Sequence, residues 1–345
     1  MSKTILRVEN LEKIYVSHKT KIQAVNNVSF SVDQGETIGI VGESGCGKTT
    51  LGRMVVRAIP ATRGKVLYTA ADGKEYDLQS LTDQEMKKVR REVQMIFQDP
   101  YSSLDPRMTV FDIISEPLRA NFRGMPKSEM ESRVRQIAEK VGLNPSYLKR
   151  YPHAFSGGQR QRIGIARALV LLPRLIVCDE AVSALDVSVQ AQVINLLRDL
   201  QREMGLTYLF ISHDLSVIEH ISDRVGVMYL GRMVEYAPSR ELFEQPLHPY
   251  SEALLSAIPV ADPEITLERI HLEGEIPNPA NAPSGCFFHP RCRYCAACCK
   301  EGTPTPLELK PGRFTACIRI RDLKLQGLPM EKLNASRVGN GSGHN

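Results

Sequence analysis

A short stretch near the start of the chain has the residue types and spacing of a phosphate-binding loop. It reads GESGCGKT over residues 42–49 and fits the pattern G-x-x-x-x-G-K-[ST]. Glycines let backbone N–H groups turn toward phosphate oxygens, and a helix that begins here directs its positive end at the same anion. Lys48 can then reach the β- and γ-phosphates, and the Thr49 hydroxyl can bind Mg²⁺. We expect nucleotide contacts from Gly42, Glu43, Ser44, Gly45, Cys46, Gly47, Lys48, Thr49 and Thr50.

Two adjacent carboxylates follow an apolar run much further along the chain. Residues 175–178 are all apolar, and Asp179 and Glu180 come directly after them. A carboxylate at the end of a buried strand can hold Mg²⁺ through water, and its neighbour points elsewhere and can orient or activate an attacking water. We therefore expect Asp179 at the metal and Glu180 as the catalytic base.

The segments around these residues alternate between two periodicities. Strand-like runs cover residues 36–41, 92–98, 175–180 and 207–212, and helical spacing covers 50–59, 156–171 and 188–204. This alternation predicts an α/β fold with a largely parallel sheet covered by helices.

Two further regions interrupt that alternation. Residues 101–151 read as a helical insertion, in which Ser128 and Glu131 form a capping-box pattern and Gly142 is a helix stop. Beyond Gly231 prolines break the pattern, and we expect one short helix at about residues 250–258.

Composition narrows the class of protein. The 345 residues carry a net charge of +5, which is too weak to indicate a nucleic-acid partner. The apolar runs are too short to span a membrane, and the N-terminus has no signal-peptide pattern, so we expect a cytosolic protein. Six of the 8 cysteines lie between Cys286 and Cys317, and in a cytosolic chain such clustering favours metal or iron–sulfur chemistry over disulfides.

Residues 155–162, FSGGQRQR, lie shortly before the two carboxylates, and their glycines bring bare N–H groups to a helix start, where an anion can bind. This stretch resembles the signature of ATP-binding-cassette (ABC) ATPases. The resemblance implies that the site acts in trans, on ATP held by the phosphate loop of a partner subunit. The implied contacts come from Ser156, Gly157, Gly158 and Gln159.

Other positions are similar to elements of the same family. Gln98 resembles the glutamine that touches Mg²⁺ or water and links to the membrane subunits, and Asp186 resembles the aspartate at the dimer seam. His213 resembles the histidine that contacts the γ-phosphate, and Tyr15 the aromatic residue that stacks on adenine. Many members have proline after the catalytic glutamate; here Ala181 should change local stiffness rather than chemistry.

The stretches 95–100, 103–108, 187–192 and 248–250 resemble the oligopeptide/dipeptide importer branch, in particular its second, F-type ATPase. This implies a heterodimer with a second homologous ATPase, two transmembrane permease subunits and an extracytoplasmic substrate-binding protein, at the cytoplasmic face of the cell membrane. Nickel or oligosaccharide cargo is one alternative. A soluble ABC ATPase that does not act in transport is another, and a metal-sensing module with a vestigial ATPase is a third.

The resemblance also implies a domain organisation. A RecA-like and antiparallel-β ATP-binding core covers residues 1–98 and 159–235, and a helical signature subdomain covers 99–158. A C-terminal importer extension, irregular and cysteine-rich, covers 236–330, and a disordered tail covers 331–345.

Some members of the branch bind a [4Fe–4S] cluster in this extension. Four cysteines match the spacing in that branch, and Cys295 and Cys298 are then spare or alternative thiols. Zinc is the alternative, and a metal-free reduced cluster is the third possibility. The implied ligands are Cys286, Cys292, Cys299 and Cys317.

Overall fold

In the computed structural model, the described residues are 3–17, 20–99, 103–259 and 269–329, so the expected tail at 331–345 lies outside them. The chain divides into two compact units. The first comprises residues 1–13, 27–38 and 49–212, and the second comprises 14–26, 39–48 and 213–345. This division follows spatial contacts and cuts the chain at other places than the organisation expected from the sequence.

The first unit contains three parallel strands that carry the two carboxylates. They are β6 (Val93–Ile96), β7 (Leu175–Asp179) and β8 (Thr207–Ile211), with β7 in the middle. Every residue of β7 and β8 is buried, as is typical of parallel strands covered on both faces. The strands predicted at 175–180 and 207–212 are confirmed, each one residue shorter.

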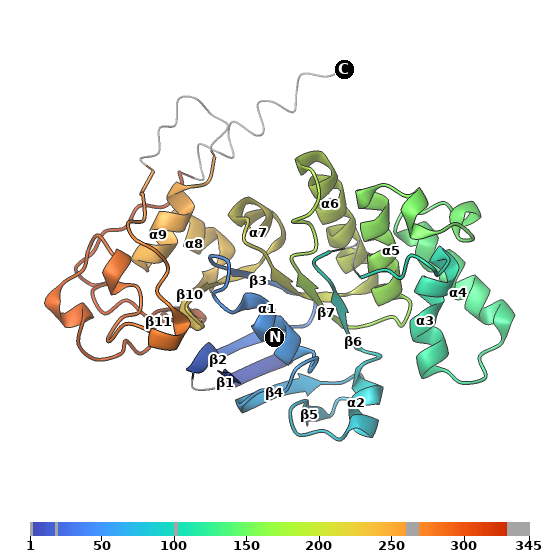
Figure 1. Cartoon of the computed structure of the whole chain (residues 1–345), viewed down its shortest axis with the longest axis horizontal. Coiled ribbons are helices and arrows are strands. Elements are labelled where there is room, and N and C mark those ends of the chain that lie inside the picture. Colours follow the sequence, from blue (N-terminus) through green and yellow to red (C-terminus); the bar gives the residue numbers. More distant parts are fainter. Residues whose placement is uncertain (1–2, 18–19, 100–102, 260–268, 330–345) are drawn as a thin grey trace, which may run out of the picture. The chain divides into compact units, whose positions relative to one another are not determined.

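An antiparallel sheet has the strand order β2-β1-β4-β5. Its strands are β1 (Thr4–Ser17), β2 (Thr20–Asp33), β4 (Arg63–Thr69) and β5 (Glu75–Asp77). Leu6 of β1 is paired with Tyr68 of β4, and both side chains are fully buried. The helix α2 (Asp83–Val89) follows β5 and begins at a capping box between Thr82 and Glu85 (Figure 1).

Helices α3 (Val110–Asn121), α4 (Lys127–Lys140) and α5 (Gly157–Leu169) contact one another in the first unit, and α6 (Val187–Met204) contacts α5 (Figure 1). The predicted capping box at Ser128 and Glu131 is wrong, because α4 already begins after Pro126, whose fixed φ suits a helix start. The predicted stop is confirmed: the helix ends at Lys140, and Gly142 has φ +72°.

The helix after the phosphate loop, α1 (Lys48–Val55), begins two residues earlier and ends earlier than expected. Arg57 lies just beyond α1 with φ +50°, a left-handed conformation that does not continue a helix.

Two 3₁₀ turns at Pro145–Tyr147 and Pro152–Ala154 lead into α5.

The second unit contains a sheet with the order β3-β9-β10-β12-β11. The strands are β3 (Thr37–Val41, in this unit from Gly39), β9 (Arg224–Tyr229), β10 (Arg232–Pro238), β11 (Leu307–Lys310) and β12 (Arg313–Thr315). The helices are α7 (Leu215–Ile221), α8 (Ser239–Glu244) and α9 (Pro249–Ser256). Three further 3₁₀ turns cover Pro279–Asn281, His289–Arg291 and Ala297–Cys299.

The helix expected at about residues 250–258 is confirmed as α9, but α8 also lies beyond Gly231, so the expectation of a single helix there is wrong. Two of the prolines there lie at the ends of elements: Pro238 ends β10, and Pro249 is the first residue of α9, where its missing N–H costs nothing. Buried Glu235 of β10 accepts hydrogen bonds from the N–H groups of Leu247 and His248, which fixes the chain where α9 begins. Burial raises the pKa of Glu235 to about 7.

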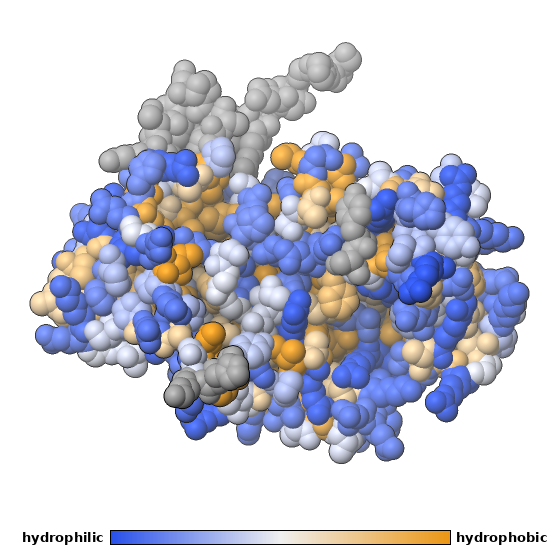
Figure 2. Space-filling model, in the orientation of Figure 1, coloured by the Kyte–Doolittle hydropathy of each residue, from blue (hydrophilic) through white to orange (hydrophobic). Residues whose placement is uncertain are grey.

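Hydrophilic side chains predominate on the face shown in Figure 2, and hydrophobic ones form small scattered groups. Within the described ranges, no helix is long and apolar enough to cross a membrane.

Candidate functional site

The phosphate loop depends on glycine at positions where the backbone has no room for a side chain. Gly42 has φ +150°, and a Cβ there would lie 2.2 Å from the carbonyl oxygen of Met228. Gly47 has φ +105°, and a Cβ there would lie 2.1 Å from the carbonyl oxygen of Ala24. The glycines thus allow the loop to approach neighbouring backbone closely as well as to expose its own N–H groups.

The ammonium group of Lys48 lies inside this loop. The residue is only 4% exposed, and its Nζ donates to the carbonyl oxygens of Gly42 at 2.7 Å and Glu43 at 3.0 Å. The positive charge is therefore held in place by the same backbone whose N–H groups would face a phosphate.

In the first unit, Thr49 and Asp179 form a direct hydrogen bond. The Thr49 hydroxyl donates to Asp179 Oδ1 at 2.8 Å, and Asp179 at the end of β7 is 1% exposed. Hydroxyl and carboxylate oxygens are the hard ligands that Mg²⁺ prefers. The oxygen atoms of Thr49 and Asp179 are therefore a donor set that fits Mg²⁺.

The structure also brings Gln98 and Glu180 together. Gln98 Nε2 donates to Glu180 Oε2 at 2.7 Å. Glu180 has φ +48°, an uncommon conformation for a residue with a side chain, and its N–H donates to the carbonyl oxygen of Ile211 in β8. Backbone strain of this kind is concentrated at functional sites. The side chain is thus fixed at the carboxyl end of the parallel strands, next to Asp179.

The signature stretch begins α5 through a reciprocal cap. The N–H of Gln159 donates to the Ser156 hydroxyl at 3.4 Å, and the N–H of Ser156 donates to Gln159 Oε1 at 3.1 Å. A Cβ on Gly158 would lie 2.5 Å from Cγ1 of Val189 in α6, so this glycine also permits two helices to pack closely. Ser156 is exposed, so the N-terminal end of α5 is accessible to solvent.

The remaining expected site residues occupy exposed positions. Asp186 caps α6 by accepting the N–H of Val189 at 3.0 Å, and the hydrogen bond from the Ser188 hydroxyl lowers the pKa of Asp186. His213 follows β8 and is exposed. Tyr15 lies in β1 and is 42% exposed, so its ring is not packed in the core.

Sequence reasoning missed two residues that contact the phosphate loop. The N–H of Glu43 donates to the Tyr250 hydroxyl at 2.8 Å, and Arg291 donates to both carboxylate oxygens of Glu43, at 2.7 and 3.0 Å. The only signal was the resemblance of residues 248–250 to the importer branch, and no pattern pointed to Arg291.

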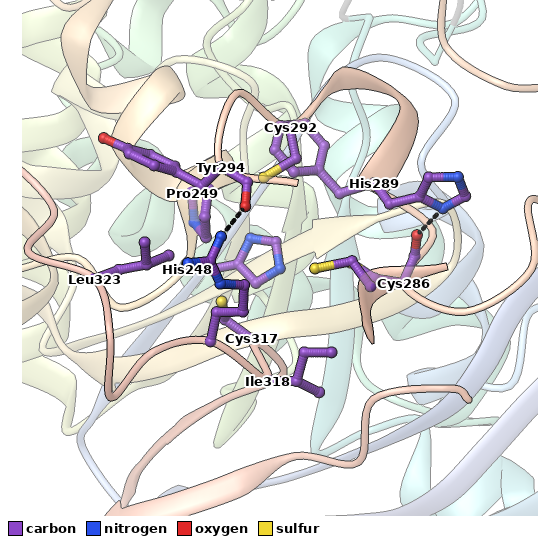
Figure 3. A pocket seen from close by; sticks show the side chains of 12 residues that line it. His248, Pro249, Cys286, His289, Cys292, Tyr294, Cys317, Ile318 and Leu323 are labelled. Carbon is purple, nitrogen blue, oxygen red and sulfur yellow. Dashed lines mark hydrogen bonds between the residues drawn. The ribbon is translucent and has the colours of Figure 1, made fainter. Parts of the chain in front are cut away.

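The four expected cysteine ligands line one pocket together with His248. Figure 3 shows the sulfur atoms of Cys286, Cys292 and Cys317 turned toward its interior, and Cys299 completes the set. Burial raises the pKa of Cys292 to about 12 and that of Cys317 to about 11, so these thiols are protonated at neutral pH. Over the described residues, no three histidine, cysteine or acidic side chains are arranged to hold one metal ion.

Comparison with known proteins places this geometry in a family. A family model described as "ABC transporter" matches residues 25–183, and one described as "Oligopeptide/dipeptide transporter, C-terminal region" matches 234–299. The oligopeptide transport ATP-binding protein AppF of Bacillus subtilis is 54% identical over 299 residues, which is 86% of this chain and 89% of that protein. The chain belongs to the ABC transporter family. As a member with both regions it is an ATP-binding subunit, and its similarity is to the peptide branch.

Solved structures show the same cassette fold. A dimeric ATP-binding cassette in a post-hydrolysis state, bound to ADP and Pi, is 29% identical and covers 68% of this chain and 99% of its own, with a TM-score of 0.60. The protein cbiO1 of Clostridium perfringens, part of an ABC transporter complex, is 27% identical and covers 70% of this chain and 91% of its own, with a TM-score of 0.61. The predicted α/β cassette is confirmed.

Proposed function

We propose that this chain hydrolyses ATP to drive the import of oligopeptides or dipeptides across a membrane. The observation that carries the proposal is the union, in one chain, of a cassette with the C-terminal region of oligopeptide/dipeptide transporters. A soluble ABC ATPase outside transport would have no reason to carry that region. Nickel and oligosaccharides remain the alternative cargoes, and no observation favours them.

The site residues divide into three roles. The phosphate loop and Lys48 bind the phosphates, as the buried ammonium supports. Thr49, Gln98 and Asp179 hold Mg²⁺, which when bound neutralises the charge that develops on the phosphates. Glu180 orients and deprotonates the attacking water, with His213 at the γ-phosphate and Tyr15 against adenine.

Two such chains would complete each other's sites. The open start of α5 at Ser156–Gln159 would bind the ATP held by a partner, and Asp186 would lie at the seam. Val187, directly after it, is 82% exposed, as expected of a residue that a partner covers. The dimeric cassette that holds ADP and Pi supports this arrangement.

The remaining partners follow from the importer branch. We infer a heterodimer with a second homologous ATPase, two transmembrane permease subunits and an extracytoplasmic substrate-binding protein, with this chain peripheral at the cytoplasmic face. The cassette core would cover residues 1–98 and 159–235, and the helical subdomain 99–158 would transmit closure to the permeases. The cysteine-rich extension would cover 236–330.

Co-purification tests the transport role. When the chain is expressed with its neighbouring genes, two multi-span proteins and a second ATPase should remain bound to it in mild detergent. In proteoliposomes, the binding protein loaded with peptide should raise ATP hydrolysis several-fold, because cargo arrival is coupled to closure. A chain that purifies without membrane subunits would contradict this role. Stimulation by nickel or an oligosaccharide, but not by peptide, would reassign the cargo.

For the cysteine cluster, we propose a bound [4Fe–4S] centre, with zinc as the alternative. Four thiols that line one pocket offer the ligand number of such a centre, and the two spare thiols lie outside that lining. Burial raises the pKa of Cys292 and of Cys317, so these two thiols would lose their protons on binding the metal, which links metal binding to the order of this irregular segment. The centre would cross-link the parts of this segment that carry the four cysteines.

Removal of one ligand checks this assignment. The anaerobically purified protein should be brown, with about four iron and four sulfide per chain. Replacing Cys292 by Ser should remove most of the iron and lower the unfolding temperature. Cys298→Ser is the matched control and should keep the colour, because Cys298 is exposed and lies outside the pocket lining. A colourless protein that contains zinc would overturn the iron assignment.

A further inference from the structure

One residue of the phosphate loop, Glu43, is bound by a side chain from outside the loop. Arg291 donates to both carboxylate oxygens of Glu43, at 2.7 and 3.0 Å, in the bidentate geometry that makes such pairs strong. The Arg291 side chain is 6% exposed and that of Glu43 is 25% exposed, so the pair is partly shielded from water. Arg291 also lies over the ring of Tyr229, 6.0 Å from its centroid.

The same glutamate is held through its backbone. Its N–H donates to the hydroxyl of Tyr250 in α9, at 2.8 Å. Its carbonyl oxygen accepts from Lys48 Nζ at 3.0 Å. The carboxylate, the N–H and the carbonyl of Glu43 are therefore all engaged, and the group that holds the Lys48 ammonium is fixed by two side chains of the C-terminal region. No part of the cassette supplies Arg291 or Tyr250.

The arginine is carried by the turn between two of the pocket cysteines. Arg291 ends the 3₁₀ turn His289–Arg291, and Cys292 is the next residue. The N–H of His289 donates to the carbonyl oxygen of Cys286, whose own N–H donates to the carbonyl oxygen of Cys299. Beneath the turn, Phe288 is 2% exposed and its ring lies 5.3 Å from that of Tyr250. We call residues 286–292 the cysteine turn. A change in this turn would therefore move the Arg291 guanidinium.

We propose that Arg291 is a positioning residue for the phosphate loop, and that the cysteine turn sets nucleotide affinity through it. The inference rests on the proposed ATP-binding function. Arg291 holds Glu43, the carbonyl of Glu43 is one of the two that accept from the Lys48 ammonium, and the loop is pre-organised for phosphate before ATP arrives. Disturbing the cysteine turn releases Glu43 and gives a mobile loop that must be ordered by the nucleotide itself.

Arg291→Ala tests the positioning role in the full-length protein. Hydrogen exchange at residues 42–48 should become faster in the nucleotide-free protein, because the loop loses its outer contact. The Kd for a fluorescent ATP analogue should rise roughly five- to tenfold, as expected for a coupling of this kind. In the assembled transporter KM should rise while kcat changes little. Arg291→Lys keeps the charge but not the bidentate contact, and should fall between the two.

Arg293→Ala is the matched control. Arg293 lies two residues further on and pairs with Glu252 at 3.5 Å, and Glu252 also accepts the N–H of Gln326, so it keeps a donor in the variant. The exchange rates at 42–48 should match those of the unmodified protein. If Arg291→Ala shows unchanged exchange there and unchanged Kd, the proposal is overturned. If Arg291→Ala does not fold, Arg291→Lys decides by the same two measurements.

A separate variant tests the role of the cysteine turn. Cys292→Ser should also speed exchange at residues 42–48, and a rate equal to that of the unmodified protein would overturn the link to the turn. Because exchange is read without nucleotide, it separates this inference from the proposed function. If the unmodified protein does not bind the ATP analogue, the proposed function is contradicted. The exchange data would still decide whether Arg291 orders the loop.

Discussion

Replacing Glu180 by Gln is expected to lower ATP turnover by roughly 100- to 10,000-fold, the usual contribution of a general base. The change keeps the size of the side chain and removes only its charge and basicity. Gln98 donates to Glu180 Oε2 at 2.7 Å, so the carboxylate is held at the strand ends beside the Asp179–Thr49 pair. ATP binding should persist, because Lys48 and the loop glycines are untouched, and the dimer should be trapped with ATP.

The measurement is steady-state ATPase activity of the assembled transporter, with the corresponding carboxylate of the second ATPase also replaced. Silencing that site ensures that any remaining turnover comes from this chain. Glu139→Gln is the control, an exposed carboxylate of α4 that should leave the rate unchanged. A normal rate in the Glu180→Gln variant would mean that another group activates the water.

The elements that carry the carboxylates could be predicted from the sequence because their patterns are local. Residues 175–178 are uniformly apolar and become the buried strand β7, which ends at Asp179. The strand β8 has the same character and is likewise fully buried. A buried parallel strand needs apolar side chains on both faces, so an apolar run bounded by polar residues marks it directly.

The C-terminal region was harder to predict, since its order comes from contacts between distant residues. The Arg291–Glu43 pair joins positions 248 apart in sequence, and no periodicity relates them. Pro249, which looked like an interruption, is instead the first residue of α9, after the N-cap His248. Gly158 is a milder case: the sequence suggested an anion-binding role, and the structure adds a packing role against Val189 that only the fold reveals.

Replacing Lys48 by Ala is expected to weaken ATP binding about 100-fold. Hydrogen bonds that involve a charged group contribute about 1.5–3 kcal/mol each, and two lost contacts to phosphate at the lower end of this range correspond to roughly this factor, at about 1.4 kcal/mol per tenfold change. Lys48 is only 4% exposed, and the carbonyls of Gly42 and Glu43 already hold its ammonium group, so little ordering is required when ATP binds. The measurement is the Kd for an ATP analogue in excess Mg²⁺.

Removal of this lysine also deprives two carbonyls of their donor, so stability must be separated from binding. Lys48→Met keeps most of the buried volume and lacks the charge; it should lose affinity as Lys48→Ala does while unfolding closer to the temperature of the unmodified protein. Lys149→Ala changes an exposed lysine and should bind normally. A Lys48→Met variant with a Kd within threefold of the unmodified protein would show that the phosphates bind elsewhere. Glu180→Gln should bind ATP without turnover and Lys48→Met should not bind it, so together the two variants separate the loop that holds the nucleotide from the carboxylate that acts on it.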